Sequence, residues 1–270
     1  MTNEHSIPSR PWWLISIVTI AAFFAIDQIN SPIYQALAEG TDGWTRRAIF
    51  VAVIYGSIIF GPMLVAGLLF GPRHIARSLG LDRGFLGGLA FALIATAPML
   101  GYFALTSPLA LPDELVWDLV SGAVLPGFGE ELLFRAFLFG FLFRFAGWGF
   151  LPAALLVALT FGAAHLYQGN SAGEAAGIFA ITAFGGLWFS WLYAEWGFNV
   201  WVPTFAHLLM NAYWEIFSVA DSAMGPMGAN IIRLVVILFS VVLTVVIAKK
   251  RRGHLLVSGR AWLWGGRKTP

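Results

Sequence analysis

The chain has 270 residues, of which 59% are hydrophobic and 11% are charged. A soluble domain carries about 25% charged residues, so this chain lacks the polar surface that a protein folded in water needs. Cysteine is absent, which excludes disulfides, thiolate metal sites and cysteine nucleophiles. The composition therefore predicts an integral membrane protein.

Apolar segments of spanning length follow one another along the chain, since about 20 apolar residues cross a bilayer. They are expected at residues 12–28, 48–71, 85–105, 116–143, 150–167, 175–194, 200–218 and 231–248. The predicted fold is an all-α polytopic membrane protein with about eight transmembrane helices. We divide the chain into N-terminal transmembrane helices (1–114), a central group of helices (115–218), and a last transmembrane helix with a basic tail (219–270).

The positive charges indicate the orientation, because cytoplasmic loops carry an excess of Lys and Arg. If both termini are cytoplasmic, twelve of the sixteen Lys and Arg residues lie inside: Arg10, Arg73, Arg77, Arg83, Arg144, Lys249, Lys250, Arg251, Arg252, Arg260, Arg267 and Lys268. Arg46, Arg47 and Arg233 lie outside, and Arg135 lies within a predicted helix. We expect the tail to be solvated; contact with anionic lipid headgroups is the alternative.

Three charges interrupt the fourth apolar segment, where "LPGFGEELLFRAF" contains Glu130, Glu131 and Arg135. Each charge near a helix centre costs about 2.5–3.5 kcal/mol on insertion scales, so the three need a compensating reason. Glu131 and Arg135 are four residues apart on one helix face, where they can pair. Glu130 points elsewhere and is left available as a general base. The alternative is a buried ion pair that only fixes helix packing.

Local features near these helices add two further expectations. Pro126, Gly127 and Gly129 weaken the helix before the charges, which would admit water or a substrate backbone. Glu195 and Glu215 fall at predicted helix ends, where we expect them to meet water.

Two other segments carry polar residues at helical spacing. In "TFGAAHLYQG" Phe161 and His165 are four residues apart, and in "FAHLLMN" His207 and Asn211 share one face. A lone histidine on an apolar helix is more often a packing residue, but this combination with Glu130 favours a polar site. At about 1.5 Å per residue, Glu130 and His165 lie roughly 21 Å from the cytoplasmic helix ends and His207 roughly 9 Å. Spacing alone therefore does not show that they converge.

The three motifs, in this order, resemble those of the CPBP intramembrane proteases. That family includes the type II CAAX prenyl endopeptidases and bacterial bacteriocin-processing and self-immunity proteins. Glu130 to Arg135 matches E-E-x-x-x-R, Phe161 to His165 matches F-x-x-x-H, and His207 to Asn211 matches H-x-x-x-N. The resemblance covers about residues 115–218, which would be the catalytic core. It implies an intramembrane endopeptidase that hydrolyses a peptide bond of a membrane-associated, prenylated or other peptide substrate.

The resemblance also implies roles for the motif residues. Glu130 would be the catalytic glutamate, and His165 would help to orient and activate a water molecule. His207 and Asn211 would stabilise the oxyanion or complete the polar site.

Two further points follow from the same motifs. Glu131 and Arg135 would hold the first motif in shape. Glu130, His165 and His207 together form a set that could hold zinc or another divalent metal, with water as the fourth ligand. A metal-free mechanism based on the glutamate is the other open possibility.

The expected partners are a peptide or protein substrate and the lipid bilayer, with no nucleic acid. A multi-pass protein of the cell membrane with this charge bias looks bacterial, which favours peptide maturation or immunity over prenyl processing. The alternative function is a non-catalytic immunity or adaptor protein that keeps the polar cluster for stability or binding. A transporter that uses Glu130 as a proton relay is a third reading.

Overall fold

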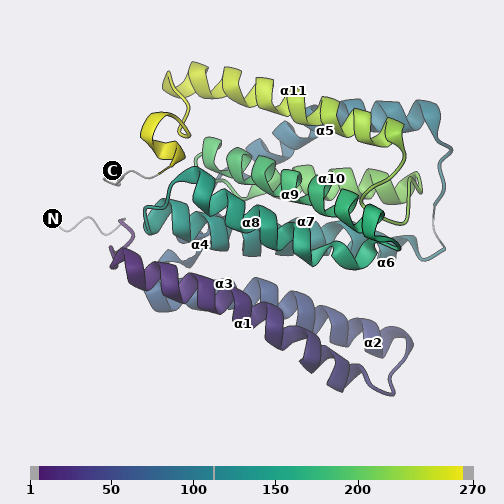
Figure 1. Ribbon diagram of the computed structural model, residues 1–270, viewed down its shortest axis with the longest axis horizontal. Coiled ribbons are helices and arrows are strands. Elements are labelled where there is room, and N and C mark those ends of the chain that lie inside the picture. Colours follow the sequence, from purple (N-terminus) through teal and green to yellow (C-terminus); the bar gives the residue numbers. More distant parts are fainter. Residues whose placement is uncertain (1–5, 112, 264–270) are drawn as a thin grey trace.

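The computed structural model describes residues 6–111 and 113–263, and within them the regular structure is helical. The helices form a bundle whose long members run along a common direction (Figure 1). The long helices are α1 (Trp12–Ala38), α5 (Phe85–Thr106), α8 (Phe150–Ala164), α9 (Ala172–Glu195), α10 (Trp201–Ile216) and α11 (Met227–Arg252). The predicted all-α fold is confirmed.

Shorter helical segments complete the outer part of the bundle. One continuous rod consists of α2 (Gly43–Phe50), the π-helix η1 (Val51–Tyr55) and α3 (Gly56–Phe70). The corner that follows it contains the 3₁₀-helix η2 (Pro72–His74) and α4 (Ile75–Ser78). Two further 3₁₀-helices are η6 (Leu166–Gln168), directly after α8, and η7 (Gly259–Trp262), near the end of the described chain.

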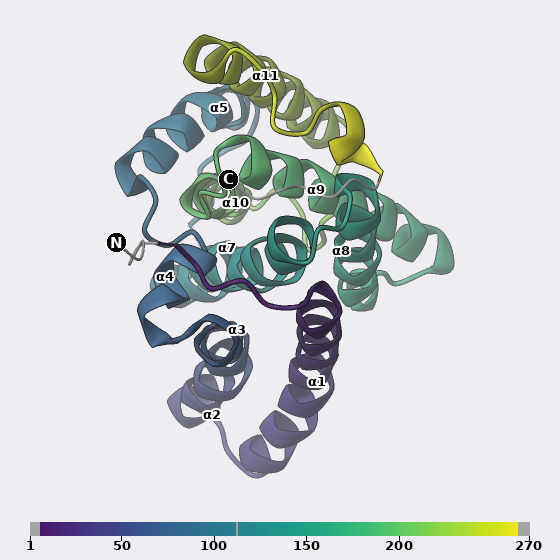
Figure 2. The same ribbon diagram turned by 90° about the vertical axis from the view of Figure 1, so that its left-hand side faces the viewer.

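The segment with the three charges forms the centre of the molecule (Figure 2). It consists of α6 (Leu115–Leu119), η3 (Val120–Val124), α7 (Leu125–Glu130), η4 (Glu131–Phe139) and η5 (Phe141–Phe145), of which the three η segments are π-helical. Every side chain of η4 is buried. The predicted helix over 116–143 is therefore present, but π-helical turns, which are frequent at functional sites, make up much of it.

In the part of the chain that the structure describes, six helical stretches are long and apolar enough to cross a membrane, as judged by length and composition. They are Trp12–Ala38, Gly43–Phe70, Phe85–Thr106, Phe150–Gln168, Ala172–Glu195 and Met227–Arg252. The other two predicted spans are also helical: one is the charged central segment, and the other is α10, which has 16 residues. The chain is thus a multi-pass membrane protein, and α1 continues to Ala38 rather than ending near residue 28.

Positively charged loops gather at one end of the bundle, where α1 begins and α11 ends (Figure 1). Arg144 Nη1 donates to the carbonyl oxygen of Arg77 at 3.0 Å, and Arg10 Nε donates to that of Leu69 at 2.7 Å. The fold thus brings together loops that the charge pattern assigns to one side. Arg267 and Lys268 of the predicted basic tail lie outside the described residues.

Glycines of the central segment serve helix packing. A Cβ atom on Gly127 would lie 2.8 Å from Leu208 Cβ, and one on Gly129 would lie 3.0 Å from the Tyr55 ring. Small residues let membrane helices approach closely, so Gly127 permits α7 to contact α10. These residues nevertheless lie in regular α-helix, Leu125–Glu130, between two π-helical segments, so the expected weakening of the helix stays a prediction.

The beginning of the tail is held against the bundle by Glu195, whose side chain is buried rather than hydrated at a helix end. Its carboxylate pairs with Arg252 at 2.8 Å and accepts hydrogen bonds from the backbone N–H groups of Leu256 and Val257 at 3.0 and 2.7 Å. A buried carboxylate needs such partners to offset its lost hydration. The expectation of a fully solvated tail is therefore wrong for its first residues.

The orientation of the bundle can be tested with reporter fusions. We expect a reporter after residue 110 and one after residue 270 to report opposite sides of the membrane, with residue 270 in the cytoplasm, because most of the positive charge lies at that end. Alkaline phosphatase and green fluorescent protein fusions measure this directly. A C-terminus on the non-cytoplasmic side would contradict the orientation.

Candidate active site

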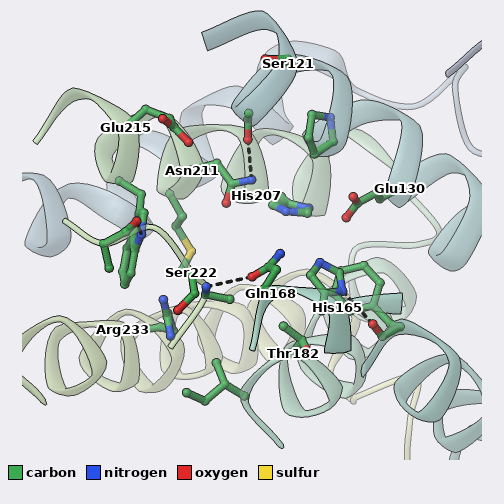
Figure 3. A pocket seen from close by; sticks show the side chains of 18 of the residues that line it. Ser121, Glu130, His165, Gln168, Thr182, His207, Asn211, Glu215, Ser222 and Arg233 are labelled. Atoms are coloured by element: carbon green, nitrogen blue, oxygen red, sulfur yellow. Dashed lines mark hydrogen bonds between the residues drawn. The ribbon is translucent and has the colours of Figure 1, made fainter. Parts of the chain in front are cut away.

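A cavity of about 470 Å³ lies beside the central segment and joins the three sequence motifs. Glu130 from α7, His165 from the end of α8, and His207 and Asn211 from α10 all line it. Figure 3 shows these four side chains around one space. The structure thus brings together the four residues whose convergence helix spacing alone does not establish.

Glu131 lies behind this cavity, with its side chain fully buried. Its Oε1 atom accepts a hydrogen bond from His207 Nδ1 at 2.8 Å and lies 2.9 Å from Arg135 Nη1. One carboxylate oxygen therefore serves two motifs at once. The predicted pairing with Arg135 is confirmed, whereas the contact with His207 is not visible in helix spacing, because it joins residues 76 positions apart.

Arg135 is surrounded by aromatic rings rather than by further acceptors. Its guanidinium lies 4.2 Å from the ring centroid of Phe161 and 5.3 Å from that of Phe189. Within the described residues, its three guanidinium nitrogens form no well-directed hydrogen bond besides the close approach to Glu131. Cation–π attraction is strongest for such desolvated cations. It gives Phe161 of the F-x-x-x-H motif a role in holding the first motif.

The two histidines are held by their Nδ1 atoms. His165 Nδ1 lies 2.7 Å from the carbonyl oxygen of Phe161, which can only accept, so we assign the proton to Nδ1. The same argument assigns a proton to His207 Nδ1, which faces the Glu131 carboxylate. In both rings Nε2 is then the atom left for chemistry. A neutral His207 of this tautomer accepts through Nε2 and donates there only after gaining a proton.

Glu130 differs from its neighbour in having no close partner. Its Oε2 atom is buried and makes no hydrogen bond within the described part of the chain. Asn211, by contrast, is oriented by the hydrogen bond from its Nδ2 to the carbonyl oxygen of Gly122 at 2.9 Å. One N–H of the Asn211 amide remains for another acceptor. The paired glutamates therefore occupy different surroundings: Glu131 is paired, and Glu130 is not.

Other polar residues of the cavity were not predicted as site residues. They are Tyr55, Ser121, Tyr167, Gln168, Thr182, Glu215, Asp221, Ser222 and Arg233. Glu215 continues the four-residue spacing of His207 and Asn211, which could have placed it on the same face of α10. The expectation that Glu215 merely meets water at a helix end is incomplete, because it lines the cavity. Arg233 lies outside the three motifs, and no sequence pattern around it indicates that it lines the cavity.

The fit of a metal ion can be tested on the arrangement of side chains. Among the residues that the structure describes, no three His, Cys, Asp or Glu side chains form a group that could hold a metal. Glu130, His165 and His207 line one cavity but do not form such a group in this arrangement. Since these residues do not fit a metal as placed, we derive no catalytic step from one.

Fold and cavity together define a multi-pass membrane protein with a polar, carboxylate- and imidazole-lined cavity among its helices. Residues 112–213 match the family described as type II CAAX prenyl endopeptidase Rce1-like. Within that segment, the match confirms the resemblance to the CPBP membrane proteases seen in the motifs. Comparison with curated proteins gives no match, and comparison with solved structures gives none either.

The ion pair behind the site leads to a stability prediction. Replacing Arg135 by methionine should strand the buried carboxylate of Glu131, at about 3–5 kcal/mol, and should lower the amount of folded protein in the membrane. The measurement is the yield of monodisperse protein after detergent extraction, together with its Tm.

The matched control is the double variant Arg135→Met/Glu131→Gln. It removes both charges, and Gln can still accept from His207 Nδ1, so we expect it to recover most of the lost yield. Normal yield of Arg135→Met alone would contradict the role assigned to this pair.

Proposed function

We propose that this protein is an intramembrane endopeptidase in which Glu130 activates a water molecule for attack on a peptide bond. The observation that carries the proposal is the unpaired, buried Oε2 of Glu130 in a cavity that also contains two oriented histidines. A carboxylate that lacks hydrogen-bond donors is poised to accept a proton. The membership of residues 112–213 in a protease family supports the same chemistry.

In the proposed reaction, a water molecule lies between Glu130 and His165. It donates one hydrogen to the Glu130 carboxylate and the other to Nε2 of His165, whose Nδ1–H is held by Phe161. Glu130 removes the proton as the water oxygen attacks the carbonyl carbon, and a tetrahedral intermediate forms. Glu130 then passes that proton to the departing amide nitrogen, and the C–N bond breaks.

The negative oxygen of the intermediate needs hydrogen-bond donors. Asn211 supplies its free amide N–H, and its geometry is maintained by Gly122. His207 supplies Nε2–H when it is protonated, and the Glu131 carboxylate next to its Nδ1 stabilises that imidazolium. In this scheme Glu131 acts on the reaction only through His207.

The position of the cavity along the bundle bears on the substrate. The segments that join α8 to α9 and α10 to α11 line the cavity, and they lie at the end of the bundle away from the start of α1 (Figure 1). If the positively charged end is cytoplasmic, this part of the cavity lies toward the other side of the membrane. This favours a membrane-associated peptide on the non-cytoplasmic side, as in peptide maturation or immunity, over a cytoplasmic prenylated substrate.

The proposed role of Glu130 is tested by Glu130→Gln, which keeps the size of the side chain and removes the base. We expect cleavage to fall by at least about 100-fold with unchanged protein level, since loss of a general base costs about 10²–10⁴ in rate. Mass spectrometry of membrane peptides from cells with wild-type or variant protein would reveal fragments that disappear.

Glu39→Gln is the matched control, because Glu39 is exposed and lines no part of this cavity. It should leave the peptide profile as in the wild type. Identical profiles for wild type and Glu130→Gln, with full biological activity, would instead favour the non-catalytic adaptor.

A further inference from the structure

Arg233 presents a cation to the cavity that the proposed reaction does not use. It lies on α11, outside the segment that matches the protease family, and its side chain lines the same space as Glu130. Figure 3 shows Arg233 beside Ser222, on the side of the cavity away from Glu130 and His165. The cavity therefore extends from a candidate base to a cation.

The guanidinium of Arg233 is oriented but not neutralised. Nη1 donates to Asn230 Oδ1 at 2.8 Å, and the Trp214 ring centroid lies 4.6 Å from the guanidinium carbon. Both contacts hold the group in place without cancelling its charge. Within residues 6–111 and 113–263, Arg233 forms no ion pair, although Glu215 and Asp221 line the same cavity.

Placing an unpaired guanidinium in a membrane helix costs free energy, so its presence calls for a functional reason. Charged residues within membrane helices are expensive, and they mark substrate or ion pathways when they face a cavity. A guanidinium has five N–H donors, of which Asn230 takes one. The remaining donors match the two oxygens of a carboxylate, the geometry that arginine binds best.

A second feature points in the same direction. The segment between α10 and α11 covers this end of the cavity, and Gln168 holds it by accepting a hydrogen bond from the backbone N–H of Ala223 at 2.9 Å. Ser222 Oγ is held nearby by Glu174 Oε1 at 3.4 Å. The end of the cavity at Arg233 therefore has a wall fixed by side chains from two other helical segments.

We propose that Arg233 binds a carboxylate of the substrate peptide while another part of that peptide lies at Glu130. The proposal names a substrate class for the proposed endopeptidase and rests on that function. The carboxylate is either the free C-terminus of the peptide or an acidic side chain, since both present the same two oxygens. Arg233 is thus a specificity-determining residue, whereas Glu130 performs the chemistry.

The experiment measures peptide binding rather than cleavage, so its result does not depend on whether the protein is a peptidase. Protein with Glu130→Gln is placed in phosphatidylcholine nanodiscs and titrated calorimetrically with N-acetyl-Val-Ala-Val-Leu as the free acid, as the C-terminal amide, and as the amide with Glu in place of the second Val. Empty nanodiscs provide the blank. We expect the free acid or the Glu-containing amide to bind about tenfold or more tightly than the plain amide.

Three variants in the same Glu130→Gln background test whether Arg233 causes this preference for a carboxylate. Arg233→Gln should abolish it, and Arg233→Lys should retain part of it, because the charge remains without the paired N–H geometry. Arg46→Gln is the matched control: Arg46 is exposed and lies outside this cavity, so the preference should persist.

The outcomes separate this proposal from the proposed function. Equal affinity for all three peptides, including no binding of any, would overturn the role of Arg233, as would a preference that survives Arg233→Gln. A preference that depends on Arg233 in a protein that hydrolyses nothing would uphold the carboxylate site and refute the peptidase.

Discussion

The buried Glu131 carboxylate is the group on which the polar site depends. It lies between Arg135 on its own helix and His207 on α10, so one oxygen connects two segments that are distant in sequence. Loss of Arg135 would leave an uncompensated charge in an apolar interior, and loss of His207 would remove a hydrogen-bond donor from the same carboxylate oxygen. Aromatic rings surround the guanidinium, and Phe189 stacks on His207 with ring centroids 5.6 Å apart. The network therefore fixes the position of one imidazole and separates the paired glutamates into a supporting residue and a free one.

Packing of the surrounding helices makes this network possible. The described residues form two apolar cores: one joins α1, α3 and α8 to η4, and the other joins α5, α9, α10 and α11. Polar side chains around the second core are satisfied between helices: Trp188 of α9 and Trp196, directly after α9, donate to Ser240 and Thr244 of α11 at 3.0 Å each. Such bonds hold neighbouring helices without adding charge. The cavity has walls from both groups, so its polar residues meet where the two halves of the bundle pack together.

Much of the fold was predictable because membrane spans depend on hydropathy and length, which are local properties. The positions of the six apolar stretches and the Glu131–Arg135 pair follow from such patterns. The π-helical turns of η4 and the contact of Glu131 with His207 do not, since they depend on how helices pack in three dimensions. The same reason applies to Glu195, whose apparent place at a hydrated helix end hides its contacts with the tail. Arg233 could be recognised only after its place in the cavity was known.

The different roles of Glu130 and Glu131 are tested most directly by comparing the variants Glu130→Gln and Glu131→Gln. Both are purified in the same nanodiscs. The Tm of each is measured, together with its single-turnover rate on one peptide that the wild type cleaves. We expect Glu130→Gln to keep the wild-type Tm and to lose the chemical step. Glu131→Gln should lose several degrees of Tm, about 2–4 °C for each kcal/mol in a domain of this size, and should retain slow cleavage. A stable but fully inactive Glu131→Gln beside an active Glu130→Gln would contradict these roles.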